Sequence, residues 1–211
     1  MHTNSKTWLA VCVAVVGGCA TGPSTIDGDA AAQQMMKSSF QAKGIATLDW
    51  LQQDALQRAC SGDTPPSAAE AQQLEAAQLA TVQWPTDGHY LGDWKAGEKL
   101  AQSGKGRTWK DKPGAANGGS CYNCHQIGKQ EVSFGIIGPS LYHYGKVRGV
   151  TNPADPASAA VVKYTWGKLW NSKAYAACSN MPRFGHSGTL TQAQIRDLMA
   201  LLLDPASPVN Q

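Results

Sequence analysis

The sequence predicts an all-α protein, and three observations support this fold class. Apolar residues recur at roughly helical spacing between residues 35 and 56. Two capping boxes, at residues 67–70 and 191–194, supply side chains that satisfy the exposed N–H groups at a helix start. After the second box, Ile195, Leu198 and Leu202 share one helix face, and Pro205 prevents the helix from continuing.

The composition is that of a small globular protein without an affinity for nucleic acid. Hydrophobic residues make up 42% of the 211 residues, charged residues 16%, and the formal net charge is +3. This length predicts one or two small domains. The chain has no basic run and no alternation of basic and aromatic residues, so we expect no nucleic-acid partner.

The N-terminus has the pattern of an export signal. Lys6 precedes a short apolar run, residues 8–16, which is too short to span a bilayer as a helix. The sequence Val16-Gly17-Gly18-Cys19 resembles the lipobox of bacterial lipoproteins, in which the cysteine is lipidated. We therefore predict a signal peptide over 1–18 and a lipid on Cys19. The alternative is ordinary signal-peptidase cleavage a few residues later.

The chain after the signal divides into three predicted parts. Residues 19–32 are small and polar and predict a flexible tether. Residues 33–84 predict a helical extension, with a break near Gly44, one helical region ending near Cys60, and another helix over 67–81. Residues 85–211 form the predicted core domain. Its first helix, capped by Asp93, carries Gly97, which would let the last helix cross it closely.

The most informative motif is Cys121-Tyr122-Asn123-Cys124-His125. This spacing is that of a c-type haem attachment site. Two intervening residues let both sulfurs reach one edge of the macrocycle, and the adjacent histidine can bind the iron. We therefore expect one covalently bound haem c. A redox dithiol or half a zinc site is the alternative, but the sequence offers neither an αβ context nor a second ligand pair at suitable spacing.

Two further cysteines remain once this motif and the cysteines of the export signal are set aside. Cys60 and Cys178 form an even pair in an exported chain, where the compartment is oxidising. We predict a disulfide between them. The alternatives are two buried free thiols, or a cysteine that binds a partner or the iron.

Met181 is the predicted second axial ligand of the iron. It lies in the segment 179–185, where Pro182 stiffens the backbone and could hold the thioether against the metal. Methionine with histidine raises the haem potential, which suits an electron carrier. The competing candidates are Met199, His143, His186 and His89.

A first helix with a glycine crossing point, the haem motif and an amphipathic last helix together resemble the class I cytochrome c fold. This resemblance implies a class I cytochrome c core with an N-terminal helical extension. It also implies that the carbonyl of Pro139, in Gly138-Pro139, accepts a hydrogen bond from His125 and so orients it. A simple turn is the alternative. Because c-type haem is attached outside the bacterial inner membrane, we expect a periplasmic protein that is lipid-anchored if Cys19 is modified.

Several segments make the resemblance more specific. The chain resembles the SoxX cytochromes of bacterial SoxAX complexes at residues 117–120, 138–141, 144–146, 178–185 and 204–210. The resemblance implies a heterodimer with SoxA that conjugates thiosulfate to a cysteine of the SoxYZ carrier, the activity of an L-cysteine S-thiosulfotransferase. This chain would be its non-catalytic, electron-accepting subunit, which passes electrons to a soluble cytochrome c.

A free periplasmic monohaem cytochrome that shuttles electrons between respiratory complexes is the alternative function. A stable partner needs a largely apolar interface, whereas a shuttle presents a charged rim for transient docking. The modest charge and the aromatic residues favour a stable partner; these include Trp109, Trp166, Trp170 and Tyr175. A further alternative treats the N-terminal helices as a mere spacer from a membrane anchor.

Overall fold

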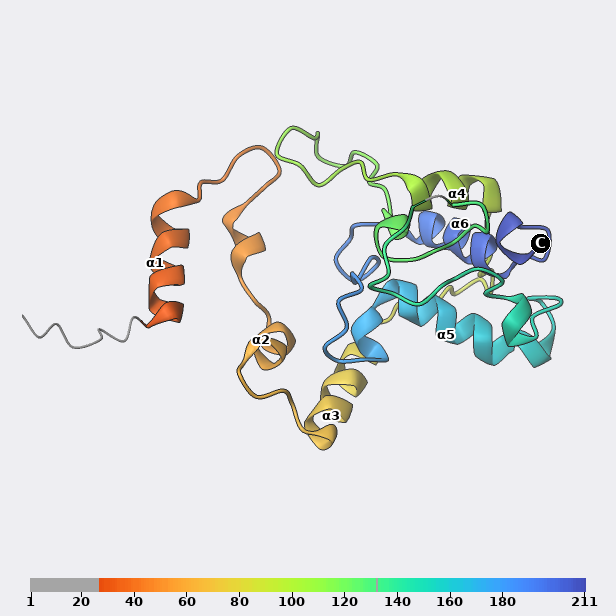
Figure 1. Cartoon of the computed structure of the whole chain (residues 1–211), viewed down its shortest axis with the longest axis horizontal. Coiled ribbons are helices and arrows are strands. Elements are labelled where there is room, and N and C mark those ends of the chain that lie inside the picture. The colour runs from red at the N-terminus through yellow and green to blue at the C-terminus, as the bar shows by residue number, and fades with distance from the viewer. Residues whose placement is uncertain (1–26, 132) are drawn as a thin grey trace, which may run out of the picture. The chain divides into compact units, whose positions relative to one another are not determined.

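The computed structural model of the chain describes residues 27–131 and 133–211 (Figure 1). The predicted signal peptide and Cys19 lie outside the described residues. The chain divides into two compact units, Met1–Phe40 and Gln41–Gln211. Within the described ranges no helix is long and apolar enough to cross a membrane.

The fold of the described residues is all-α, as predicted. Its regular elements are helices, joined by short 3₁₀ turns, and the sole β feature in these ranges is an isolated bridge between Lys43 and Ala46. The α-helices are α1 (Gly28–Ser39), α2 (Ala55–Ser61), α3 (Ala68–Leu79), α4 (Trp94–Gln102), α5 (Ala159–Trp170) and α6 (Gln192–Leu203).

Helix α1 belongs to the first unit and spans the end of the predicted tether and the start of the predicted helical extension. It begins at Gly28, inside the predicted tether. The carboxylate of Asp27 accepts hydrogen bonds from the N–H groups of Asp29 and Ala30, each at 3.1 Å, and so caps the helix start. Three successive alanines over 30–32 then favour the helix, because alanine has the highest helix propensity.

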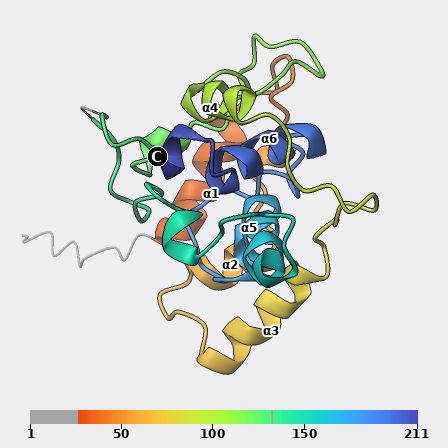
Figure 2. The ribbon, with the colours of Figure 1, turned by 90° about the vertical axis from the view of Figure 1, so that its right-hand side faces the viewer.

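In the second unit, the crossing of α4 and α6 is the most extensive contact between two of its helices (Figures 1 and 2). Asp93 caps α4 and Thr191 caps α6 with a complete capping box, both as predicted. Gly97 lies against the backbone of α6, where a Cβ atom would overlap the carbonyl of Asp197. The absence of a side chain at Gly97 therefore allows the close approach of the two helices.

We expect Gly97→Ala to destabilise the second unit although alanine is the better helix former. The added methyl group forces α4 and α6 apart, and overpacking of this kind costs about 2 kcal/mol. Gly28→Ala is the matched control, because Gly28 is also helical and its Cβ would meet nothing within 4 Å. Chemical denaturation should give a lower midpoint for Gly97→Ala and no decrease for Gly28→Ala. Equal midpoints would contradict the packing argument.

The core of the second unit lies between α6 and α5. From α6, Ile195, Leu198 and Met199 are buried, and from α5, Trp166 and Trp170 stack with ring centroids 6.0 Å apart. Helix α5 was not predicted from the sequence. It follows the turn Pro156–Ser158, where Asp155 caps the chain and Pro156 favours a helix start.

Residues 41–84 of the predicted extension pack on the predicted core domain within the second unit. The amide of Asn171, fully buried after α5, donates to Gln78 Oε1 of α3 at 3.0 Å, and Trp166 Nε1 donates to the carbonyl of Gln83 at 2.9 Å. These contacts are inconsistent with a mere spacer.

Candidate functional site

The Cys121–His125 motif forms a tight turn. It begins with a 3₁₀ turn, Cys121–Asn123, entered from Ser120, whose φ of 51° is left-handed. The N–H groups of Cys124 and His125 both donate to the carbonyl of Cys121, at 3.1 and 2.9 Å. The turn therefore places both cysteines and the histidine beside one another.

These residues line a cavity of about 620 Å³ in the second unit. This volume lies within the usual range for sites that bind small molecules or cofactors. Cys121, Cys124 and His125 lie along it together with Met181, and most of the other lining residues are apolar. They come from α4, the motif, the segment 137–144, α5, residues 178–185 (the methionine loop) and α6; among them are Ala101, Ile127, Leu141, Leu169, Phe184 and Leu198.

His125 is oriented by the segment that follows the motif. Its Nδ1 lies 2.7 Å from the carbonyl oxygen of Pro139, which the sequence analysis expected as its partner. A carbonyl can only accept, so Nδ1 carries the proton and the lone pair of Nε2 is free for a metal. The N–H of Gly138 donates to the carbonyl of Cys124 at 2.8 Å, and a Cβ at Gly138 would overlap the imidazole ring.

The Cys121 thiol lacks the lowered pKa that is typical of a redox dithiol. Burial raises the pKa of the Cys121 thiol to about 12. A reactive dithiol or a zinc ligand needs a thiolate, which a lowered pKa favours. In the part of the chain that the structure describes, no group of three or more His, Cys, Asp or Glu residues could hold a metal ion.

The other four candidates for the second axial position do not line the cavity. Met199 is fully buried in α6, and His143 Nε2 lies 2.6 Å from the carbonyl of Gln211. His186 follows the methionine loop, and its N–H donates to the carbonyl of Trp170. His89 lies beside Asp87, with 80% of its side chain exposed. Of the five candidates, Met181 is the one that lines the cavity.

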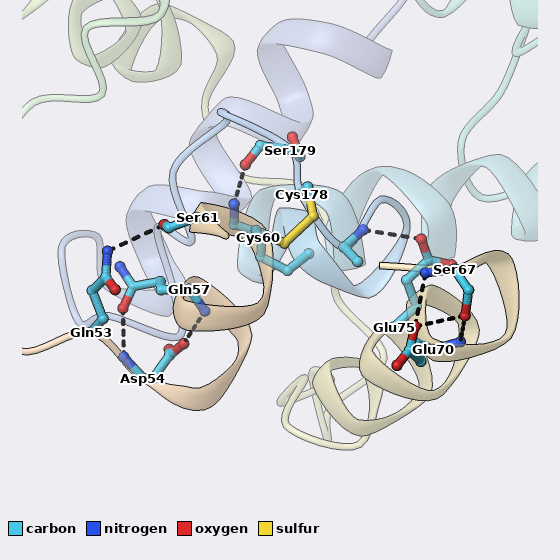
Figure 3. The surroundings of a disulfide bond; sticks show 12 residues. Gln53, Asp54, Gln57, Cys60, Ser61, Ser67, Glu70, Glu75, Cys178 and Ser179 are labelled. Carbon is cyan, nitrogen blue, oxygen red and sulfur yellow. Dashed lines mark hydrogen bonds between the residues drawn. A yellow bond between two sulfur atoms is a disulfide. The ribbon is translucent and has the colours of Figure 1, made fainter. Parts of the chain in front are cut away.

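Cys60 and Cys178 form a disulfide, the pairing expected from the cysteine count. Figure 3 shows it joining the last turn of α2 to the start of the methionine loop. Nearby, Glu75 of α3 accepts a hydrogen bond from the N–H of Ala177 at 3.0 Å. The extension is thus attached next to the segment that carries Met181.

An ion pair between Asp54 and Arg183 is a second link between the extension and the methionine loop. This link should weaken in acid. Arg183 Nη1 lies 2.7 Å from Asp54 Oδ2. Partial burial of Asp54 raises the pKa of its carboxyl, but the Gln57 N–H and Arg183 outweigh this and hold it below 3.8. The resulting stability is present above pH 3.8 and is lost as the pH falls through the lower pKa of the folded chain.

We therefore expect the attachment of α2 to weaken in acid. Hydrogen exchange of α2 amides should accelerate, relative to a model peptide, as the pH falls below about 3.8. Asp54→Asn keeps a helix cap but has no titrating group, so its relative exchange rates should depend less on pH. Identical pH profiles for the two proteins would contradict the assignment.

The cavity also has polar lining residues that the sequence analysis missed. Tyr144 and Thr165 hydrogen-bond to each other at 2.9 Å, and Arg148 lies over the Tyr144 ring at 3.7 Å from its centroid. Lys168 lines the same cavity, and burial lowers the pKa of its amine. Thr165 and Lys168 lie on α5. They were missed because that helix was not predicted from the sequence.

The fold and the site together describe an all-α protein with a Cys-x-x-Cys-His turn on a largely apolar cavity. No family model matches the chain. An uncharacterized lipoprotein of Aquifex aeolicus (strain VF5) is 37% identical over 162 residues, which cover 75% of this chain and 73% of that relative. The chain belongs to the family of this lipoprotein.

Proposed function

We propose that this chain is a monohaem c-type cytochrome that transfers electrons. Cys121 and Cys124 would bind the haem covalently, and His125 and Met181 would be its axial ligands. The observation that supports this best is that all four side chains line one cavity. The bond from His125 Nδ1 to Pro139 also presents Nε2 as the metal-binding atom.

The site supports electron transfer rather than catalysis by this chain alone. When bound, a haem with histidine and methionine ligands supplies reversible one-electron chemistry at a raised potential. If His125 and Met181 both held the iron, a substrate would find no open coordination position. The apolar lining, which includes Ile127, Leu198 and Phe184, would limit the access of water to the group.

The class I cytochrome c fold is part of this proposal. The support is the crossing of α4 and α6 at Gly97, with the motif between them in sequence and the cavity beside both helices. The extension formed by α2 and α3 would be an addition to that fold.

We further propose that the chain acts as a SoxX-type subunit. It would pair with a SoxA subunit, accept electrons while thiosulfate is conjugated to the SoxYZ carrier cysteine, and pass them to a soluble cytochrome c. The sequence segments that resemble SoxX support this role, and the methionine loop among them borders the cavity. The complex, not this chain alone, would be the enzyme.

The relative is described as a lipoprotein, and this description supports a lipid-anchored location for this chain. We propose that Cys19 is lipidated after export and that the protein works in the periplasm, anchored to the membrane.

Co-expression with the candidate SoxA subunit tests the function. We expect the two chains to co-elute in size-exclusion chromatography and to support thiosulfate-dependent reduction of cytochrome c when SoxYZ is present. Met181→Leu is an informative variant, because it keeps the size of the side chain but removes the sulfur. The variant should still co-elute with the SoxA subunit, and the resulting complex should turn over more slowly than the wild-type complex. Separate elution, with turnover that does not need this chain, would favour the free electron shuttle.

A further inference from the structure

The methionine loop is held by the extension on both sides of Met181. Before Met181, the disulfide joins Cys178 to Cys60 in the last turn of α2 (Figure 3). After Met181, Arg183 pairs with Asp54, the residue that caps the start of the same helix. The two ends of α2 therefore hold the chain on the two flanks of the predicted iron ligand.

Helix α3 adds a second set of contacts. Glu75 accepts a hydrogen bond from the N–H of Ala177, just before the loop. Gln78 Oε1 accepts from Arg183 Nη1 at 3.3 Å and from the buried amide of Asn171 at 3.0 Å. One side chain of α3 thus contacts both the end of the loop and the end of α5.

The backbone of the methionine loop also accepts hydrogen bonds from a turn that packs against α3. The Ser172 hydroxyl donates to the carbonyl of Met181, and the Lys173 amine donates to the carbonyl of Ser179. Both donors belong to the 3₁₀ turn Ser172–Ala174, against which α3 packs. The extension therefore reaches the backbone of Met181 through this turn as well as through the loop ends.

His125 is held differently. Its ring bonds to Pro139 and rests against Gly138, both in the core segment that follows the motif. Loosening the extension should therefore disturb the methionine side of the cavity and leave the histidine side unchanged.

We propose that α2 and α3 form a clamp that positions Met181 as an axial ligand, with Cys60, Asp54 and Glu75 as its positioning residues. This inference rests on the proposed haem site. A thioether is a weak, neutral ligand, so its hold on iron depends on how closely the loop is kept at the bonding position. When the loop moves away more often, an external ligand binds with a higher apparent affinity.

Two variants weaken the clamp at different points. The first replaces Cys60 and Cys178 with serine together, which leaves no unpaired thiol. The second, Asp54→Asn, removes the charge opposite Arg183 while asparagine still caps α2. Asp87→Asn is the matched control, because it removes the charge from the Asp87–Arg196 pair, which joins the segment before α4 to α6.

Imidazole binding to the ferric protein, followed by its optical spectrum, measures the effect. We expect the double serine variant to bind imidazole about tenfold more tightly than the wild type, and Asp54→Asn about threefold. Asp87→Asn should match the wild type. The charge-transfer band of methionine-ligated ferric haem should weaken in the same order, while far-ultraviolet circular dichroism should show that the variants remain folded.

Hydrogen exchange of residues 179–184 provides a second measurement that does not use the haem spectrum. It should accelerate in both clamp variants and remain unchanged in Asp87→Asn. Unaltered imidazole affinity and unaltered exchange would overturn the clamp but leave the haem site standing. A wild-type chain that acquires no covalent haem would instead refute the proposed function.

Discussion

Replacing both Cys121 and Cys124 with alanine should abolish covalent haem attachment. The two sulfurs line the cavity and are the atoms that would form the thioether bonds. Haem staining after denaturing electrophoresis should fall to background. The folded chain should also lose stability, because the cavity loses the apolar group that would fill it.

Tyr122→Phe is the control for this pair. Tyr122 lies between the two cysteines, and its hydroxyl makes one long bond, 3.4 Å from the amide of Gln102. Its removal should leave haem attachment intact. Haem that stays bound to the double alanine variant under denaturing conditions would refute attachment at this motif.

Gly138→Val should disrupt the histidine side of the site. A Cβ at Gly138 would overlap several ring atoms of His125, and valine adds two methyl groups beyond it. The imidazole must move, which breaks its bond to Pro139 and shifts Nε2 from its bonding position. We expect a high-spin or haem-depleted protein whose unfolding free energy is lower by about 3 kcal/mol.

Gly128→Ala is the matched control, because Gly128 also follows the motif but its Cβ would lie 3.8 Å from the nearest atom, in Glu131. This variant should keep the wild-type spectrum and stability. A normal low-spin spectrum in Gly138→Val would show that the close packing of Gly138 on His125 is not needed.

The helices that could be predicted carry local signals. The capping boxes at Ser67 and Thr191 begin α3 and α6, and Asp93 begins α4, as expected. Helix α5 was missed because its buried positions surround much of the helix, which leaves no clear polar stripe to indicate it. Residues 28–32, the start of α1, were assigned to a tether because Gly28 and the small residues after it outweighed the capping role of Asp27, whereas the rest of α1 lies in the predicted helical extension.

The residues of the site also divide into those with a local sequence signal and those without one. The motif Cys121–His125 is local, so its chemistry is visible in the sequence, and counting the cysteines was enough to pair Cys60 with Cys178. The pairing of Asp54 with Arg183 leaves no local pattern, because the two residues meet only through the fold. The clamp contacts were not predicted for the same reason.

The mass and spectrum of the intact mature chain test the central claim most directly. The chain is expressed with a cytochrome c maturation system, alongside a known cytochrome c as a loading control. We predict a mass increase of one haem that survives denaturation, and a low-spin ferric spectrum whose methionine band disappears in Met181→Leu. A chain with the mass of the bare polypeptide, beside a fully loaded control, would contradict the account.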